Sequence, residues 1–136
     1  MLQWRDEYSV KLPFFDRQHQ QLLEIGQGIQ QLLDDYQGQD TFDEIAGKLS
    51  ELADYTRYHF AQEEKVMAEF AYPELEEHVK EHRAFIAYLE SLDMSAIDQN
   101  QEETLRELMK FITSWVFRHI MKTDFKYSDF LLKAMT

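Results

Sequence analysis

Residues 59–67 read His-Phe-Ala-Gln-Glu-Glu-Lys-Val-Met (HFAQEEKVM) and place an acidic residue in the middle of an apolar helical stripe. Apolar residues recur at helical spacing on both sides of this stretch, which predicts one amphipathic helix over about residues 41–70. His59 and Glu63 share the buried face of this helix because they are four residues apart. A carboxylate on such a face is unfavourable unless it is paired or bound to a metal. Since no Lys or Arg lies on the facing stripes, a bound cation is the better explanation for Glu63.

The same periodicity predicts three further long helices. The chain contains only four Gly and two Pro residues, which suits long helices with short connections. Asp16 is a plausible N-cap of the first of these helices. The three helices cover about residues 16–37, 73–91 and 101–121.

The remaining segments are shorter. We expect an irregular arm over residues 1–15, a polar loop around 92–100 and a short fifth helix from about 124 to 134. The sequence therefore predicts an all-α fold, an antiparallel up-down-up-down four-helix bundle with an N-terminal arm and a short C-terminal fifth helix. With 136 residues, it reads as a single domain. We divide it into the arm, the bundle of residues 16–121 and the C-terminal helix of residues 122–136.

All five histidines lie on predicted core-facing stripes. A single histidine on an apolar face is more often a hydrogen-bonded core residue than a metal ligand, and pairs four residues apart also occur on surfaces without function. The buried carboxylate of Glu63 makes metal binding the better explanation for these histidines, and Asp124 offers a second inward carboxylate. The candidate metal ligands are therefore His19, His59, Glu63, His78, His82, His119 and Asp124.

Seven donors are too many for one ion and suit two metals bridged by the carboxylates. Imidazole and carboxylate donors without sulfur match first-row ions such as iron. Zinc is usually content with four ligands.

His119 and Asp124 pose a geometric problem. Five residues apart on a straight α-helix, they point ~140° away from each other. We therefore predict that the helix ends or bends near residues 121–123. In the simpler interpretation Asp124 is the N-cap of the last helix, a role that is compatible with metal binding.

Several spaced motifs run through nearly the whole chain. They are Trp4-x3-Tyr8-x-Val10, Asp16-x2-His19, His59-Phe60-x2-Glu63-Glu64-x2-Met67, Tyr72-Pro73, His78-x3-His82-x2-Phe85 and Trp115-x3-His119-Ile120-x3-Asp124-x2-Tyr127. In combination they resemble the hemerythrin family, specifically its bacterial single-domain members. No ligand position is substituted, and the main departure is a long polar connection over residues 92–103.

The resemblance implies a non-haem di-iron centre with two iron ions per chain and an oxo or hydroxo bridge between them. It also implies an open position for dioxygen on the iron with fewer imidazoles. The family divides the ligands into three imidazoles on one iron (His78, His82, His119), two on the other (His19, His59) and two bridging carboxylates (Glu63, Asp124).

The donor set favours reversible dioxygen binding over oxidation. Ferritin-like di-iron sites carry more carboxylates and fewer histidines, and a histidine-rich set stabilises lower oxidation states. We therefore expect a non-enzymatic protein for oxygen storage, delivery or sensing, with Tyr8 and Tyr127 as candidates to orient ligands. An apolar pocket should protect the bound oxygen, although ordinary core packing explains each of its residues equally well. The candidate pocket residues are Leu22, Phe60, Phe85, Trp115, Val116 and Ile120.

Two other functions stay open at this point. One is a di-iron enzyme that reduces O2, peroxide or nitric oxide, since NO, azide and peroxide would bind at the same open position. The other is an interaction module or an iron store. Turnover far above the iron content would distinguish the enzyme from the oxygen binder.

Composition excludes several classes of function. A formal net charge of −12 disfavours nucleic acids and anionic membranes as partners. The absence of cysteine excludes disulfides, thiolate zinc sites, iron–sulfur clusters and covalent haem attachment. The sequence contains neither an apolar run of the ~20 residues that span a membrane nor a secretory signal in its first residues. We expect a cytoplasmic protein that is a monomer or a small homo-oligomer.

Overall fold

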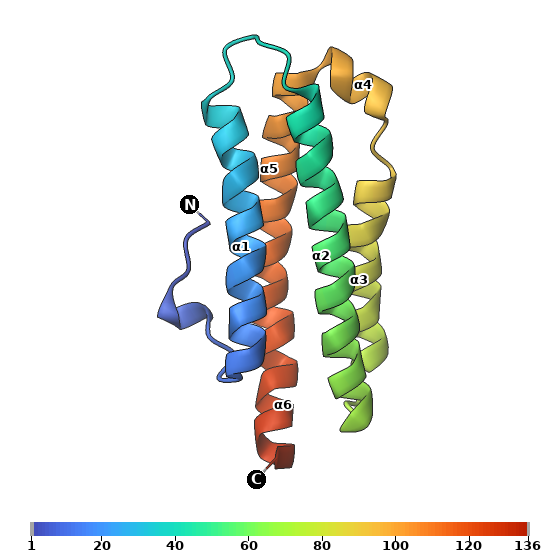
Figure 1. Cartoon of the computed structure of the whole chain (residues 1–136). Helices are drawn as coiled ribbons and strands as arrows, with labels where there is room; N and C mark the ends of the chain where they lie inside the picture. The colour runs from blue at the N-terminus through green and yellow to red at the C-terminus, as the bar shows by residue number, and fades with distance from the viewer. Residues whose placement is uncertain (1, 136) are drawn as a thin grey trace.

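The computed structural model describes residues 2–135, which contain helices and no strand (Figure 1). The long helices are α1 (Pro13–Asp34), α2 (Phe42–Glu69), α3 (Leu75–Glu90) and α5 (Gln101–Arg118). The shorter elements are the 3-10 turn η1 (Asp6–Tyr8), α4 (Met94–Gln99), the π-helical segment η2 (His119–Asp124) and α6 (Phe125–Met135). The predicted four-helix bundle with an N-terminal arm and a C-terminal helix is confirmed. None of the helices in this part of the chain combines the length and the apolar content that a membrane crossing requires.

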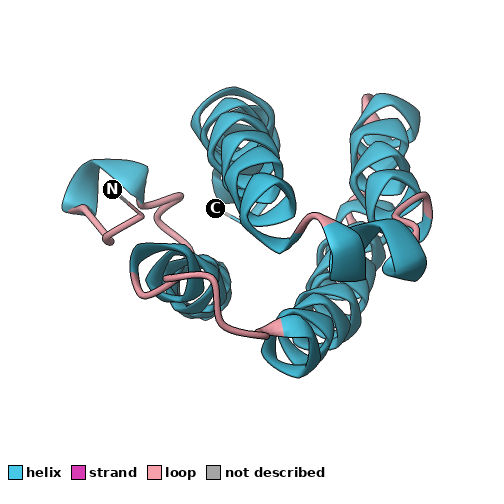
Figure 2. Ribbon diagram, turned by 90° about the horizontal axis from the view of Figure 1, so that it is seen from above, coloured by secondary structure: helices cyan, strands magenta, loops and turns pink. Residues whose placement is uncertain are grey.

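The four long helices occupy the corners of a bundle when it is viewed along its axis (Figure 2). α1 packs closely against α2 and α5, and α2 packs against α3, whereas α3 and α5 approach each other less closely. Aromatic side chains fill the wider space between α3 and α5. The Phe85 ring lies 5.4 Å from that of Phe111 and 4.7 Å from that of Trp115.

A small second core joins the arm to the C-terminal end of the bundle. Its buried residues are Val10, Phe15, Met67, Tyr72, Tyr127 and Leu131. The Ser128 hydroxyl adds a hydrogen bond of 2.7 Å to the Val10 carbonyl. α6 therefore packs with the arm at this end of the bundle.

Two local predictions are wrong. The segment 92–100 contains the helix α4, whose N-cap Asp93 accepts a hydrogen bond from the Ser95 amide. Helix α1 begins at Pro13 rather than at Asp16, because proline is favoured in the first turn of a helix. The Asp16 carboxylate instead accepts hydrogen bonds from Ser9 and from the Val10 amide, and so holds the arm against α1.

The predicted end or bend near residues 121–123 is also wrong. The chain stays helical from α5 through η2 into α6, with Arg118 and Phe125 in right-handed helical conformation on either side. A π-helix closes i→i+5 hydrogen bonds, so residues five apart lie about one turn apart. His119 and Asp124 therefore face the same side of the helix without any interruption.

Truncation of Leu52 to alanine tests the bundle core. Leu52 is fully buried in α2 within the main hydrophobic cluster, which also contains Ile29, Ile45, Leu105, Leu108 and Ile112. We expect the substitution to lower the free energy of unfolding by about 2–5 kcal/mol, measured by urea unfolding of the metal-free protein. Met94→Ala, at a side chain that is 42% exposed, is the control and should change it by less than about 0.5 kcal/mol. Equal effects of the two substitutions would contradict this packing.

Candidate metal centre

The structure brings together all seven residues that the sequence singles out. Each is at most 2% exposed. They form two groups whose possible ligand atoms lie within 4.8 Å of one another, and Glu63 belongs to both. One group contains Glu63, His78, His82, His119 and Asp124, and the other contains His19, His59 and Glu63.

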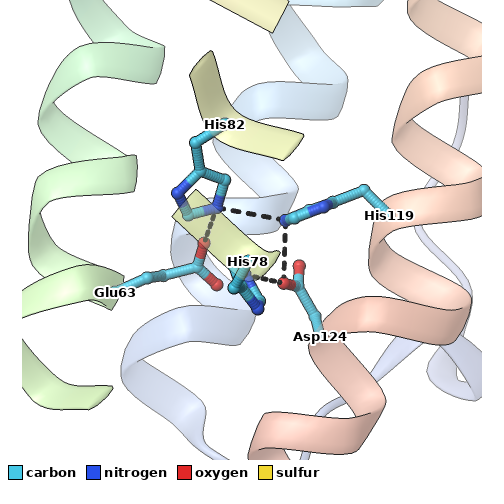
Figure 3. A group of neighbouring side chains, drawn as sticks. All are labelled: Glu63, His78, His82, His119 and Asp124. Atoms are coloured by element: carbon cyan, nitrogen blue, oxygen red, sulfur yellow. Dashed lines mark hydrogen bonds and ion pairs between the residues drawn. The ribbon is translucent and has the colours of Figure 1, made fainter. Parts of the chain in front are cut away.

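Asp124 lies between imidazoles of three helical elements. Its Oδ1 atom is 2.9 Å from Nε2 of His119 in η2 and 3.0 Å from Nε2 of His78 in α3 (Figure 3). Its Oδ2 atom is 3.2 Å from Nε2 of His19 in α1. Because Asp124 belongs to the π-helical segment η2, its carboxylate lies among these imidazoles inside the bundle.

Glu63 has the corresponding place on α2. Its Oε1 atom lies 3.2 Å from Nε2 of both His59 and His82, and its Oε2 atom lies 3.6 Å from Nε2 of His19. The Tyr127 hydroxyl donates a hydrogen bond of 2.6 Å to Oε2. Tyr127 therefore orients a carboxylate of the cluster.

Tyr8, the other tyrosine that the sequence suggests for orienting ligands, packs elsewhere. Its ring lies 6.0 Å from that of Trp4 and 5.4 Å from that of Phe117. Tyr8 belongs to the main hydrophobic cluster, in which it packs with Leu2 and Trp4 of the arm.

Three of the imidazoles have a hydrogen-bond acceptor at Nδ1. Nδ1 of His59 lies 2.5 Å from Oε1 of Gln18, and Nδ1 of His82 lies 2.8 Å from Oε2 of Glu64. Nδ1 of His119 lies 3.1 Å from Oε1 of Glu81. An acceptor at Nδ1 places the proton there and directs the Nε2 lone pair inward, the arrangement found at histidine metal ligands.

The helical periodicity of the sequence does not identify Gln18 and Glu64 as acceptors. Gln18 and Glu64 lie 41 and 18 residues away from the histidines that they contact. Helical spacing relates residues on one helix and carries no information about partners on another. Their one visible signal is that each stands next to a candidate ligand in the sequence, Gln18 before His19 and Glu64 after Glu63.

The donor set fits a cation. Nε2 of His82 and Nε2 of His119 are 3.1 Å apart, so at most one proton lies between them. Nε2 of His19 and of His78, Oε1 of Glu63 and both Asp124 oxygens are buried and make no hydrogen bond within the described residues. Such groups are unfavourable unless something satisfies them, and a metal ion accepts lone pairs from all of them. Imidazole and carboxylate donors are suited to first-row metals, including iron.

Without a metal, protons balance the charge of the carboxylates. Burial lowers the pKa of His19, but its contacts with Asp124 and Glu63 outweigh this and raise it to about 9. Burial also lowers the pKa of His119, but the negative charge of Asp124 outweighs this effect and raises that pKa to about 10. Burial raises the pKa of Glu63, yet the neighbouring His59 and His19 hold it well below its usual range. The cluster therefore keeps its carboxylates ionised and attracts positive charge.

Aromatic rings cover one side of the cluster. The Phe60 ring stacks on His82 at 3.9 Å between centroids, and the Trp115 ring stacks on His119 at 4.3 Å. Phe85 contacts both rings. The other predicted pocket residues, Leu22, Val116 and Ile120, are buried in the main hydrophobic cluster.

Comparisons with known proteins agree with this geometry. A family model described as the hemerythrin HHE cation binding domain matches residues 10–131. A bacteriohemerythrin of Clostridium acetobutylicum is 33% identical over 95% of this chain and 100% of the relative. A bacteriohemerythrin of Pseudomonas aeruginosa is 32% identical over 99% of this chain and 84% of the relative. A myohemerythrin of Riftia pachyptila is 30% identical over 91% and 88%, respectively.

Removal of metal should destabilise the protein, because the buried carboxylates and imidazoles then lose their common cation. We expect chelation to lower the free energy of unfolding by about 3–4 kcal/mol when free metal is at hundredfold to thousandfold its Kd. Calorimetric melting before and after dialysis against a chelator measures this change. Asp124→Ala is the control, in which chelation should have a much smaller effect. An unchanged melting temperature after complete metal removal would contradict the metal centre.

Proposed function

Because the chain belongs to the hemerythrin family, we propose that its buried cluster holds two iron ions and binds dioxygen reversibly. The observation that carries this proposal is the convergence of five imidazoles and two carboxylates on one buried point. These side chains come from α1, α2, α3 and η2, so every corner of the bundle contributes.

The two overlapping groups of donors suit two ions. Glu63 belongs to both groups, and Asp124 approaches His19 of one group as well as His78 and His119 of the other. Glu63 and Asp124 are therefore the residues that would hold both ions together. When bound, the iron pair supplies the electrons that dioxygen takes up on binding and returns on release.

The proportion of neutral donors favours binding over oxidation. Glu63 and Asp124 are the two carboxylates of the cluster, facing five imidazoles. Ferritin-like di-iron sites have about four glutamates and two histidines. Fewer anionic donors give less support to the high oxidation states that cleave the O–O bond. This difference supports an oxygen binder over an oxidase.

The surrounding residues exclude water and hold the donors in place. Phe60 and Trp115 stack on two of the imidazoles, and Tyr127 fixes one oxygen of Glu63. A dry apolar surface next to the site suppresses side reactions with water and protons. We propose that this apolar surface is extended by Leu22, Phe85, Val116 and Ile120. NO, azide and peroxide would compete with dioxygen for the binding site. Oxygen storage, delivery or sensing is the role that such a site would serve.

Anaerobic loading with ferrous iron followed by an oxygen titration tests the proposal. We expect about two irons per chain, the number that the resemblance implies, and a visible absorption change in O2 that reverses under argon. His59→Ala should lose iron, whereas Tyr58→Ala, at an exposed neighbouring residue, should retain it. An irreversible change, or steady consumption of O2, peroxide or NO far above the iron present, would favour the enzyme instead.

Replacement of Phe60 by leucine tests the shielding role of the aromatic rings. Leucine keeps an apolar side chain in α2 but removes the ring that stacks on His82. We expect an unchanged iron content and several-fold faster irreversible oxidation in air, followed by the loss of the reversible absorption change. Phe111→Leu is the matched control, because Phe111 packs on Phe85 and Tyr88 rather than on an imidazole. Equal oxidation rates in the two variants would show that the stacked ring gives no protection.

A further inference from the structure

The cluster depends on the π-helical segment η2. In a regular α-helix His119 and Asp124 would point ~140° apart, and only one of them could face the cluster. In η2 their side chains meet, with Nε2 of His119 2.9 Å from Oδ1 of Asp124. Extended π-helical segments are rare, so this one requires interactions that favour it over the α form.

One residue outside the cluster contacts this segment twice. Oε1 of Glu81, in α3, lies 3.1 Å from Nδ1 of His119. The Thr123 hydroxyl lies 2.8 Å from each oxygen of the same carboxylate. A single side chain on α3 therefore joins two donors that are four residues apart in η2.

The contacts of Glu81 join two parts of the bundle that are otherwise loosely packed against each other. α3 and α5 approach each other less closely than the other neighbouring helices do. Among the described residues, Glu81 accepts the hydrogen bonds between α3 and η2 that lie outside the cluster, and the other polar contacts between these elements are those of His82 with His119 and of His78 with Asp124. The Glu81 side chain is 40% exposed and lines an open pocket of about 480 Å³ together with Thr123 and His119. Its charge thus lies near water and needs little desolvation.

We propose that Glu81 is a positioning residue, whose carboxylate clamps the π turn of residues 119–124 to α3 and so holds Asp124 and the Nε2 atom of His119 at the centre of the bundle. The effect on iron rests on the proposed function. The clamp itself does not, because its contacts join protein groups.

The alternative is that Glu81 only orients the His119 ring, as an ordinary partner of a ligand imidazole. In that case Thr123 would be irrelevant to the π turn. The clamp instead requires both contacts. Thr123→Val separates the two readings, because it removes the hydroxyl and leaves the carboxylate–imidazole contact intact.

Amide hydrogen exchange in the metal-free protein tests the clamp directly. In Glu81→Ala we expect exchange of the amides of residues 119–124 to accelerate on the order of tenfold or more, because both contacts are lost. Thr123→Val should give a smaller acceleration in the same segment. Glu81→Gln, which retains an acceptor oxygen within reach of both donors, should restore most of the protection. The control Glu76→Ala removes an exposed glutamate of α3 and should leave this segment unchanged.

Iron retention provides the second readout. Loss of partners of metal ligands typically weakens metal binding 10–100-fold. We expect a loss in this range for Glu81→Ala in competition with a chelator, a smaller loss for Thr123→Val and near-normal retention for Glu81→Gln. The visible spectrum of the iron-loaded Glu81→Ala protein should also shift, because the geometry of His119 and Asp124 changes.

The outcomes separate this inference from the proposed function. Unchanged exchange of residues 119–124 in Glu81→Ala would overturn the clamp, as would wild-type exchange in Thr123→Val or a Glu81→Gln protein as impaired as Glu81→Ala. If Glu81→Ala does not fold, Thr123→Val and Glu81→Gln still decide. A wild-type protein that binds no iron would refute the proposed function, while the exchange data would still test the clamp.

Discussion

The structure depends on the burial of two ionised carboxylates, Glu63 and Asp124, in the middle of a small bundle. Neither side chain is exposed to solvent. An isolated buried charge is prohibitively unfavourable, so the interior must supply compensating positive charge. The five imidazoles and the Tyr127 hydroxyl surround these carboxylates and orient them. Several of the donor atoms make no hydrogen bond within the described residues, so their lone pairs are available to a metal.

This requirement shapes the bundle at several levels. Each of the four corners contributes at least one imidazole, which fixes the rotation of every long helix about its axis. The last helix meets the requirement through a π turn, because an α-helix cannot present His119 and Asp124 on one face. Aromatic rings fill the wider spacing of α3 and α5, and one of them, Trp115, covers an imidazole, as Phe60 of α2 does. Phe60 and Trp115 thus belong both to the packing of the bundle and to the surroundings of the polar cluster.

The sequence predicts the bundle and the seven side chains that meet inside it, because both follow from periodicity within single helices. The stripe around Glu63 reveals a buried charge, and the histidines lie on the equivalent stripes of the other helices. Periodicity does not reveal that η2 is a π-helical segment that brings Asp124 to the same side as His119, since a π turn has no spacing signature of its own here. It also misses Gln18, Glu64 and Glu81, whose contacts cross between helices. Asp16 shows the same limit, because its side chain caps no helix and holds the arm instead.

The same electrostatic constraint explains the acceptors at Nδ1 of the imidazoles, which are Gln18, Glu64 and Glu81. A carboxylate beside an imidazole increases the electron density of the ring, but a third or fourth fully buried negative charge would need further compensation. Glu64 and Glu81 avoid this problem because their side chains are 34% and 40% exposed, so water carries much of the charge. The corresponding partner of His59 is Gln18, which is 6% exposed and neutral. Acceptors near the surface are thus anionic and the buried acceptor is an amide, as expected if desolvation decides which polar side chain each position tolerates.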